Sequence, residues 1–249
     1  MKNMPALLLS ILLLFFSCNI QSSKNTDPTY VQKLEYGLNG SVKEVTNYTC
    51  NVENGKIPTD TTHYIAKRTT AFDKAGNVLE VQRVWKPGHT GNGAIRKTNF
   101  TMTFFGKGKD ISFECRYILE DGEVEKYGGK YVWSDDYNYR IAESENRSYS
   151  NHITLDKNFR VIKTAFKKND TIQSSEDLKY SYKDNKLYER INTITENGDN
   201  GEKKLTYQIK VSQKYDKHGN PTVTYEYSDL EKQNLVEVHF AEYEYYEKK

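Results

Sequence analysis

The sequence predicts an all-β protein built as one long antiparallel meander of about 10–13 strands. Long segments alternate between apolar and polar residues, as the stretch from Lys204 to Val211 does, and a period of two is typical of strands. Turn-forming residues recur between these segments without intervening helical patterns, so parallel β-α-β units are not expected. The meander could stay an open twisted sheet, or fold into a sandwich or closed barrel.

The best-defined turns are two copies of one unit, Phe72–Asn77 and Tyr215–Asn220. In each, an Asp can accept a hydrogen bond from the backbone two residues on, and a later Gly can adopt positive φ. This chemistry is typical of a type I turn followed by a left-handed residue, which closes a hairpin with a bulge. An altered copy begins at Asp156, where Phe159 replaces the Gly, and we expect Asn158 to take the left-handed conformation instead.

One short helix is expected before the strands. Asp27 can cap it, Pro28 suits its first turn and Gly37 can end it. Its apolar residues fall on roughly one face, so it should cover an end or a face of the sheet; they are Tyr30, Val31, Leu34 and Leu38.

Strands are then expected in order along the chain, and alternation is poor only over residues 137–151. The expected strands are 41–52, 62–72, 78–85, 95–105, 111–120, 124–133, 152–155, 161–166, 178–182, 187–194, 204–215, 222–227 and 235–246. Their second face carries Lys, Thr, Glu and Gln instead of an apolar band, so a transmembrane barrel is not expected.

The composition excludes one class of partner. The chain has 36 basic and 34 acidic side chains, which gives no electrostatic case for nucleic acid. Mean hydropathy is −0.84, so the core should be thin. The 20 Tyr residues explain how such a polar chain folds, because each can bury a ring while its hydroxyl stays wet.

The N-terminus indicates export. Lys2 precedes an apolar run from Leu7 to Phe16, which is too short to span a bilayer comfortably, and Ser17 and Cys18 follow. This ending resembles the lipobox of bacterial lipoproteins, although the residues before Cys18 depart from the strict pattern. The resemblance implies lipidation of Cys18; the alternative is an ordinary cleaved signal. We therefore expect a signal peptide at 1–17, a flexible tether at 18–29 and one β domain at 30–249.

The repeated turn unit, Phe/Tyr-Asp-Lys-x-Gly-Asn, resembles the YD (Rhs-type) repeat. It is also similar to units in β-sheet lipoproteins of Gram-negative anaerobes, in which an opening like Leu38–Val45 precedes the first strand. This resemblance implies an extracytoplasmic β-sheet scaffold, and it carries no catalytic residues across.

The remaining cysteines, Cys50 and Cys115, stand at strand positions that alternate with polar residues. Each is interpreted as a buried thiol, with a disulfide between them as the alternative in an oxidising compartment. Neither has a His or second Cys at ligand spacing, so no metal site is predicted, and no cofactor.

The chain lacks the spacings of the common catalytic motifs. The five His residues form no metalloprotease motif, and no nucleophile elbow is present. We interpret each as a surface or rim residue, with His239 alternating outward from Val238 and Phe240; the five are His63, His89, His152, His218 and His239. A glycosidase carboxylate pair cannot be chosen from scattered acidic residues without geometry.

Two surface features are candidates for binding or modification. The Gly-rich stretch Lys86–Gly93 fits no phosphate-binding fingerprint, but as a loop on a rigid sheet it is the best candidate rim. Trp85, Trp133 and His89 could form a platform for a ligand such as a sugar; the alternative for the Trp residues is core packing. Separately, Asp60-Thr61-Thr62 and Asp170-Thr171-Ile172 resemble an O-glycosylation sequon of Gram-negative anaerobes, which implicates Thr61 and Thr171.

The sequence therefore predicts a lipid-anchored outer-membrane protein, facing the periplasm or the surface, with a non-enzymatic binding or structural role. Its sheet would meet a protein or a glycan. The alternatives are an enzyme acting on envelope glycans, with carboxylates from separate strands, and an immunity or antitoxin-like partner.

Overall fold

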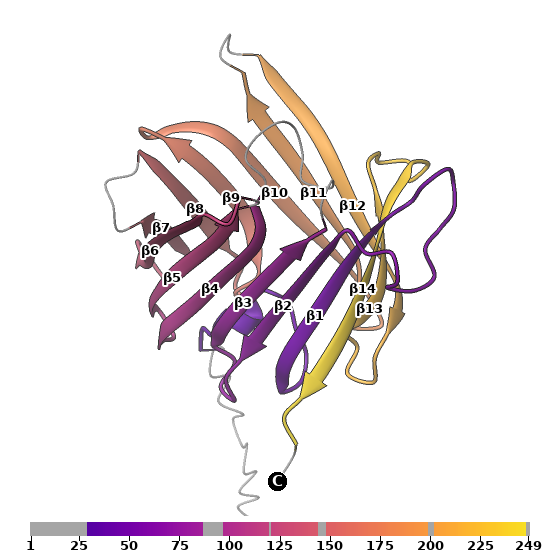
Figure 1. The fold of residues 1–249 in the computed structure, drawn as a ribbon, viewed down its shortest axis with the longest axis horizontal. Helices are drawn as coiled ribbons and strands as arrows, with labels where there is room; N and C mark the ends of the chain where they lie inside the picture. The colour runs from indigo at the N-terminus through magenta and orange to yellow at the C-terminus, as the bar shows by residue number, and fades with distance from the viewer. Residues whose placement is uncertain (1–28, 87–96, 120, 144–147, 199–201, 248–249) are drawn as a thin grey trace, which may run out of the picture.

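The computed structural model describes residues 29–86, 97–119, 121–143, 148–198 and 202–247. Fourteen strands form a closed antiparallel barrel in which each strand pairs with its neighbours in sequence and β14 pairs with β1 (Figure 1). The all-β prediction is confirmed, and the chain adopts the barrel among the expected alternatives. The strands are β1 (Val42–Asn51), β2 (Ala66–Phe72), β3 (Val78–Trp85), β4 (Lys97–Lys107), β5 (Asp110–Leu119), β6 (Val124–Trp133), β7 (Asn138–Glu143), β8 (Tyr149–Leu155), β9 (Val161–Lys168), β10 (Thr171–Lys183), β11 (Lys186–Asn197), β12 (Lys203–Tyr215), β13 (Pro221–Tyr227) and β14 (Leu235–Tyr245).

The region of poor alternation contains β7 and the first part of β8. β7 is only six residues long, so its inward pair, Tyr139 and Ile141, is too brief to give a pattern. These two side chains nevertheless pack with the core around buried Ile153, which is the register partner of Tyr139.

The repeated unit forms the turns that the sequence predicts. Asp73 Oδ1 accepts hydrogen bonds from the backbone N–H groups of Gly76 and Asn77, both at 2.8 Å, and Gly76 has φ +99°. Asp216 likewise accepts from the N–H groups of His218 and Asn220 at 2.9 Å. In both copies the side chain of the Asp organises the backbone of the turn.

The altered third copy corrects one expectation. Phe159, and not Asn158, takes the left-handed conformation, with φ +61°. A non-glycine residue is strained there, and burial of the aromatic ring offsets that strain. The Phe159 ring packs edge-on against the ring of Tyr30, with centroids 5.5 Å apart.

The segment from Tyr30 to Gly40 closes the end of the barrel at which these turns lie, and Figure 1 shows it in indigo inside the ring of strands. We call this segment the plug. The expected helix is wrong: the segment holds only a three-residue 3-10 turn, η1 (Gln32–Leu34), because Val31 is extended, with φ −141°. Gly37 ends the turn with φ +64°, as its sequence position indicates.

The plug is held by all three copies of the turn unit. At the first copy, Lys33 N–H donates to the Gly76 carbonyl at 2.9 Å, and the Gln32 side chain accepts from Val78 N–H at 3.0 Å. At the second, fully buried Asn220 accepts from Asn39 N–H at 2.8 Å and donates to the Asn39 carbonyl at 3.0 Å. The third contributes Phe159 against Tyr30. The three turns therefore form the surface to which the plug binds.

The apolar core lies inside the barrel in two clusters. One surrounds the start of the plug, and its buried members are Tyr30, Ile111, Tyr139, Ile153, Leu155 and Phe159. The other lies at the ends of β1, β2 and β3, with Leu38 of the plug against it; its buried members are Val42, Val45, Phe72, Val78 and Val81. Each cluster depends on a different part of the plug.

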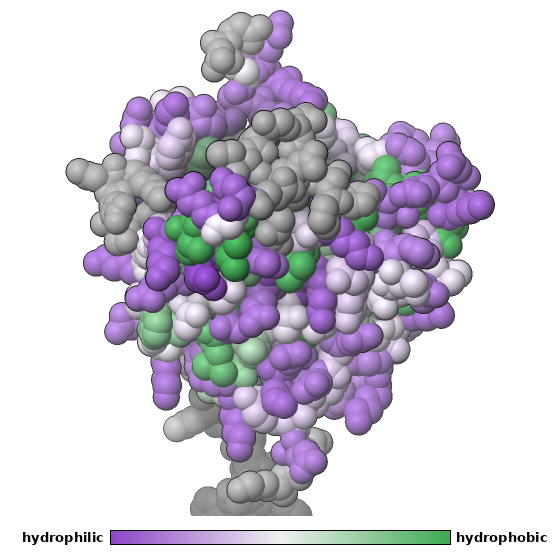
Figure 2. Space-filling model, viewed as in Figure 1, coloured by the Kyte–Doolittle hydropathy of each residue, from purple (hydrophilic) through white to green (hydrophobic). Residues whose placement is uncertain are grey.

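The outer wall is largely polar. Figure 2 shows mostly hydrophilic side chains on the face in view, with small apolar patches between them. Among the residues that the structure describes, no helix is long and apolar enough to span a bilayer. Cys50 and Cys115 are not bonded to each other: Cys50 is on β1, with its Sγ 3.7 Å from the carbonyl of Asp60 in the β1–β2 connection, whereas Cys115 is on β5.

Asn220→Ala should destabilise the protein by roughly 1–3 kcal/mol, because it removes the two part-buried hydrogen bonds between Asn220 and the Asn39 backbone. Urea unfolding followed by circular dichroism measures this. Asn158→Ala, at an exposed turn position of the third copy, is the matched control and should cost little. Equal effects of the two changes would contradict the conclusion that Asn220 holds the plug in place.

The plug also carries a carboxyl group with a shifted pKa. Glu35 lies among aromatic side chains and accepts hydrogen bonds from the hydroxyls of Tyr30, at 2.5 Å, and Tyr139, at 3.0 Å. Burial raises the pKa of Glu35 to about 7, although both hydrogen bonds oppose the rise. The protonated acid is thus favoured in the folded state.

Because the pKa of Glu35 is higher in the folded protein than the 4.5 of the unfolded chain, its contribution to stability is full below pH 4.5 and is lost as pH rises through about 7. Unfolding free energies at pH 5 and pH 8, compared between wild type and Glu35→Gln, isolate this contribution. The pH-dependent difference should be on the order of 3 kcal/mol. An unchanged difference between the two proteins across this range would show that Glu35 titrates normally.

Candidate functional site

A cavity of about 610 Å³ lies inside the barrel above the plug. Its wall comes from seven adjoining strands, β11 to β14 and β1 to β3, and its floor from Tyr36, Gly37 and Leu38. It extends to Ile65 and Trp85 near the other end of these strands. A cavity closed at one end by packed turns and lined by rigid strands has the form of a small-molecule site.

At this cavity, β12 and β14 place polar side chains inward. Gln208, Lys210 and His239 line it, whereas Ile209 and Val238, which alternate with them, are fully buried on the other side of the wall. The expectation that His239 points outward from Val238 is therefore wrong. The outer side here is covered in part by connections: the β1–β2 connection contacts Cys50, and Lys232 of the β13–β14 connection pairs with Glu189.

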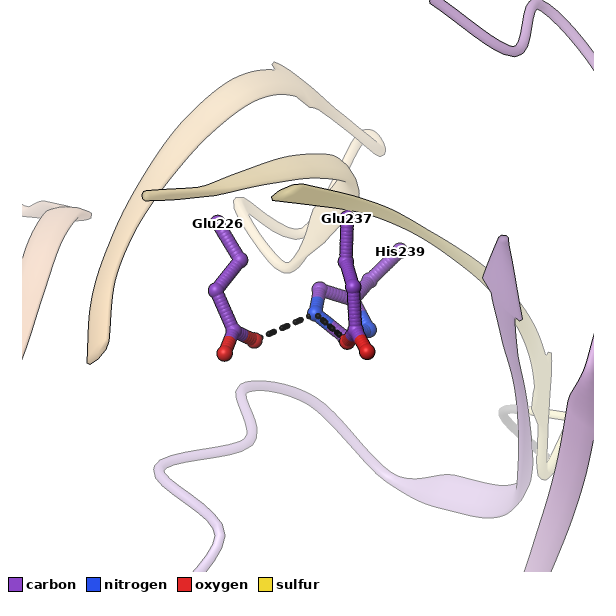
Figure 3. Close-up of side chains that lie close together, drawn as sticks. All are labelled: Glu226, Glu237 and His239. Atoms are coloured by element: carbon purple, nitrogen blue, oxygen red, sulfur yellow. Dashed lines mark hydrogen bonds and ion pairs between the residues drawn. The ribbon is translucent and has the colours of Figure 1, made fainter. Parts of the chain in front are cut away.

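Four charged or titratable side chains from β12, β13 and β14 meet in the wall. Glu226 Oε2 lies 2.8 Å from Lys210 Nζ and 2.7 Å from His239 Nε2, and Glu237 Oε2 lies 3.4 Å from the same His nitrogen. Figure 3 shows Glu226, Glu237 and His239 converging. Register explains the meeting, because Glu226 is the direct partner of both Lys210 and Glu237.

The neighbours of these groups set their charges. Burial alone raises the pKa of Glu226, but the His239 hydrogen bond and the Lys210 charge outweigh it and lower the pKa to about 2. Burial lowers the pKa of His239, so its ring is neutral at pH 7, donating from Nε2 to Glu226 while Nδ1 accepts from the Thr49 hydroxyl at 3.2 Å. Burial and the charge of Glu226 raise the pKa of Glu237.

Glu226, Glu237 and His239 each offer one ligand atom, and these atoms lie within 4.8 Å of one another. This is the donor set of a divalent metal site. However, the Lys210 ammonium lies 2.8 Å from Glu226 and 3.3 Å from His239 Nε2. A metal ion would have to displace that cation, so we describe the cluster as a buried ion pair braced by a neutral histidine.

Three arginines complete the charged lining. Arg68 donates to the Tyr36 hydroxyl at 3.0 Å, and the Arg83 guanidinium stacks over the Trp85 ring at 4.5 Å. Arg190 Nε is buried and has no hydrogen-bond partner among the described residues. With Lys210, the cavity has four cations against two carboxylates, Glu226 and Glu237.

The structure separates the residues of the expected aromatic platform. Trp85 lines the cavity, but Trp133 packs in the core against Tyr30 and Tyr139, with ring centroids 4.7 Å apart in both cases. His89 and the loop beyond Lys86 lie outside the described residues. Among the described parts of the chain, the two tryptophans thus do not form one surface, and core packing explains Trp133.

The proposed modification sites remain predictions. Thr61 lies in the β1–β2 connection and Thr171 is the exposed first residue of β10, so both stand at or beside turns. Cys18 lies outside the described residues. No protein-family model, curated protein or solved structure matches the chain.

The sequence reasoning did not identify Arg68, Arg83, Lys210, Glu226 or Glu237. The one feature of the sequence that could have identified them is a charged residue at an alternating position of a strand, and this is equally typical of a solvated outer face. Only the closure of the barrel turns that polar face inward.

Glu226→Gln should destabilise the protein by about 3–5 kcal/mol at pH 7, because it leaves Lys210 as an uncompensated buried charge. Urea unfolding measures the loss. The double variant Lys210→Met/Glu226→Gln should recover most of it. Glu244→Gln breaks an exposed pair with Lys43 on the outer wall and serves as the control, with little expected change. A large loss in the control, or none in Glu226→Gln, would contradict this account.

Proposed function

We propose that the protein is a non-enzymatic binding protein of the cell envelope and takes a small polar ligand into its barrel. The cavity supports this most directly: it is closed at the plug end, lined by seven strands of which six contribute charged or titratable side chains, and large enough for a ligand of the size of a sugar or an amino acid. The ligand surface is thus the inner wall of the sheet, where the sequence had suggested an outer one.

The envelope location is proposed from the sequence, through lipidation of Cys18. The chain enters the barrel at the plug end, where Tyr30 packs. An anchor twelve residues before Tyr30 would hold this end towards the membrane. The opposite end, with Trp85 and the β1–β2 connection, would then face away from it and receive the ligand.

An enzyme acting on glycans is the second candidate, and one observation favours it. The pKa values of Glu226 and Glu237 are moved in opposite directions, as in an acid and nucleophile pair. The contacts of Glu226 favour binding instead, because the same oxygen already lies against Lys210 and His239.

Screening tests the proposal. Thermal shifts with a defined panel of sugars, sugar acids, sugar phosphates and amino acids should identify a stabilising compound, and calorimetry should give one site per chain. A ligand at a hundred times its Kd stabilises by about 2.7 kcal/mol. Gln208→Trp, which fills part of the cavity, should abolish the effect, whereas Ser112→Trp on the outer side of β5 should retain it.

Two results would count against the proposal. Identical binding by wild type and Gln208→Trp would place the ligand outside the barrel. Conversion of a glycoside in the panel, lost in Glu237→Gln, would favour the enzyme over the binding protein.

A further inference from the structure

We infer that the ligand of this cavity is acidic, and that its anionic group is bound between the guanidinium groups of Arg68 and Arg83. The inference rests on the proposed function, since it names the chemical class of ligand for the same cavity. Four features of the cavity carry it.

The first is the juxtaposition of two like charges. Arg68 on β2 and Arg83 on β3 are direct register partners, and both side chains line the cavity. Like charges directly opposite each other in a sheet are destabilising. The pKa of Arg83 is lowered by burial and then by the charge of Arg68, so the two groups do repel each other. An anion between them would remove this repulsion.

The second feature is unused hydrogen-bonding capacity. Arg83 has five N–H donors, yet its side chain makes no hydrogen bond or ion pair among the described residues and stacks on the face of Trp85. The one carboxylate whose charge raises the pKa of Arg83 is that of Glu237, and it makes no ion pair with Arg83 among the described residues. A guanidinium that lines a cavity and is held in place by stacking on a ring is preorganised for a planar carboxylate or a phosphate.

The third feature is the balance of charge. The cavity is lined by four basic side chains and two carboxylates, and the neutral His239 adds no charge. One carboxylate, Glu226, is already paired with Lys210. The remaining positive charge lies on the arginines, and buried Arg190 Nε has no partner among the described residues. An acidic ligand balances this charge, whereas a neutral ligand would leave it uncompensated.

The fourth feature is Trp85, which lines the cavity while the Arg83 guanidinium covers one face of its ring. A ring carried by the acid can lie against the part of the indole that borders the cavity, as sugars and aromatic rings do. The chemical class is therefore a ring-bearing acid, with either a carboxylate or a phosphate as its charged group.

A pair of fluorescent dyes that differ by one anionic group tests the inference. The probes are 8-anilinonaphthalene-1-sulfonate, which is acidic, and N-phenyl-1-naphthylamine, which has the same rings without the sulfonate. Wild type should bind the acidic dye about tenfold more tightly. Arg83→Gln should weaken its binding about tenfold or more, while binding of the neutral dye stays within about twofold.

The control is Arg116→Gln, which removes the same charge from the exposed outer face of β5 and should leave both dyes unaffected. Arg83→Lys should recover part of the affinity for the acidic dye, because it keeps the charge but loses the forked donors.

In addition, Arg83→Gln should raise the urea midpoint of the unliganded protein, because it removes the repulsion by Arg68. A structural role for Arg83 predicts the opposite shift.

The outcomes separate this inference from the proposed function. If both dyes bind equally and Gln208→Trp weakens both, the cavity binds ligands but the acidic class is wrong. If neither dye binds, or Gln208→Trp changes neither, the inference falls, and the ligand panel with Gln208→Trp decides the proposed function separately. Unchanged binding of the acidic dye by Arg83→Gln also overturns the inference.

A competition experiment identifies the charged group that the cavity prefers in its ligand. Benzoate and phenyl phosphate carry the same ring with a carboxylate or a phosphate, and each can be titrated against the bound acidic dye. Stronger displacement by one identifies the charged group of the ligand class. Displacement by neither, at concentrations that saturate simple arginine sites, would contradict the inference.

Discussion

The hydrogen bonds that join the plug to the turn units are the constraint on which the rest of the structure depends. Asn220 satisfies both backbone groups of Asn39, and Gln32 reaches the first backbone N–H of β3. These contacts close one end of a wide barrel that strands alone would leave open. They fix Tyr30 and Leu38 inside the two core clusters, and they give the cavity its floor.

The division of the interior follows from this closure. On the side of β4 to β9, aromatic and aliphatic side chains fill the space around the start of the plug. On the side of β11 to β3, the wall carries charges, and the ion pair of Lys210 with Glu226 neutralises only part of them. A buried pair of this kind is weak evidence for stability. Its orientation into a cavity, next to arginines that make no ion pair with a described residue, connects it to ligand binding instead.

The sequence predicted correctly those features that are set by residues close together in the chain. Asp73 and Asp216 build their turns from residues within five positions, so the antiparallel connectivity could be predicted from them. The absence of a regular helix in the plug could not be predicted from the local sequence, because the conformation of Val31 and Gln32 is set by contacts with distant strands. Phe159 takes a strained φ for a similar reason, since its ring is buried against Tyr30.

The candidate site was hidden by an ambiguity of alternation. A period of two shows that Lys210 and Ile209 face opposite sides, but not which side is enclosed. In β12 and β14 the apolar side is covered from outside and the polar side lines the cavity, so the usual assumption fails for His239. Trp133 could be assigned to core packing or a platform from sequence, and only its contacts with Tyr30 and Tyr139 decide between them.

The pairing of β1 with β14 has a consequence for how the chain folds. The ring closes between segments about as far apart as this domain allows: Thr49 and His239, in contact across the seam, are separated by 190 positions. Contacts of such high sequence separation form slowly. Until β14 is in place, β1 and β13 both present unpaired edges, which are templates for aggregation. Glu44 on β1 is a charge of the kind that protects such an edge, and so is Glu226 on β13. Glu226, which organises the charged cluster of the mature cavity, would thus also protect the unpaired edge of β13 from aggregation before the barrel closes.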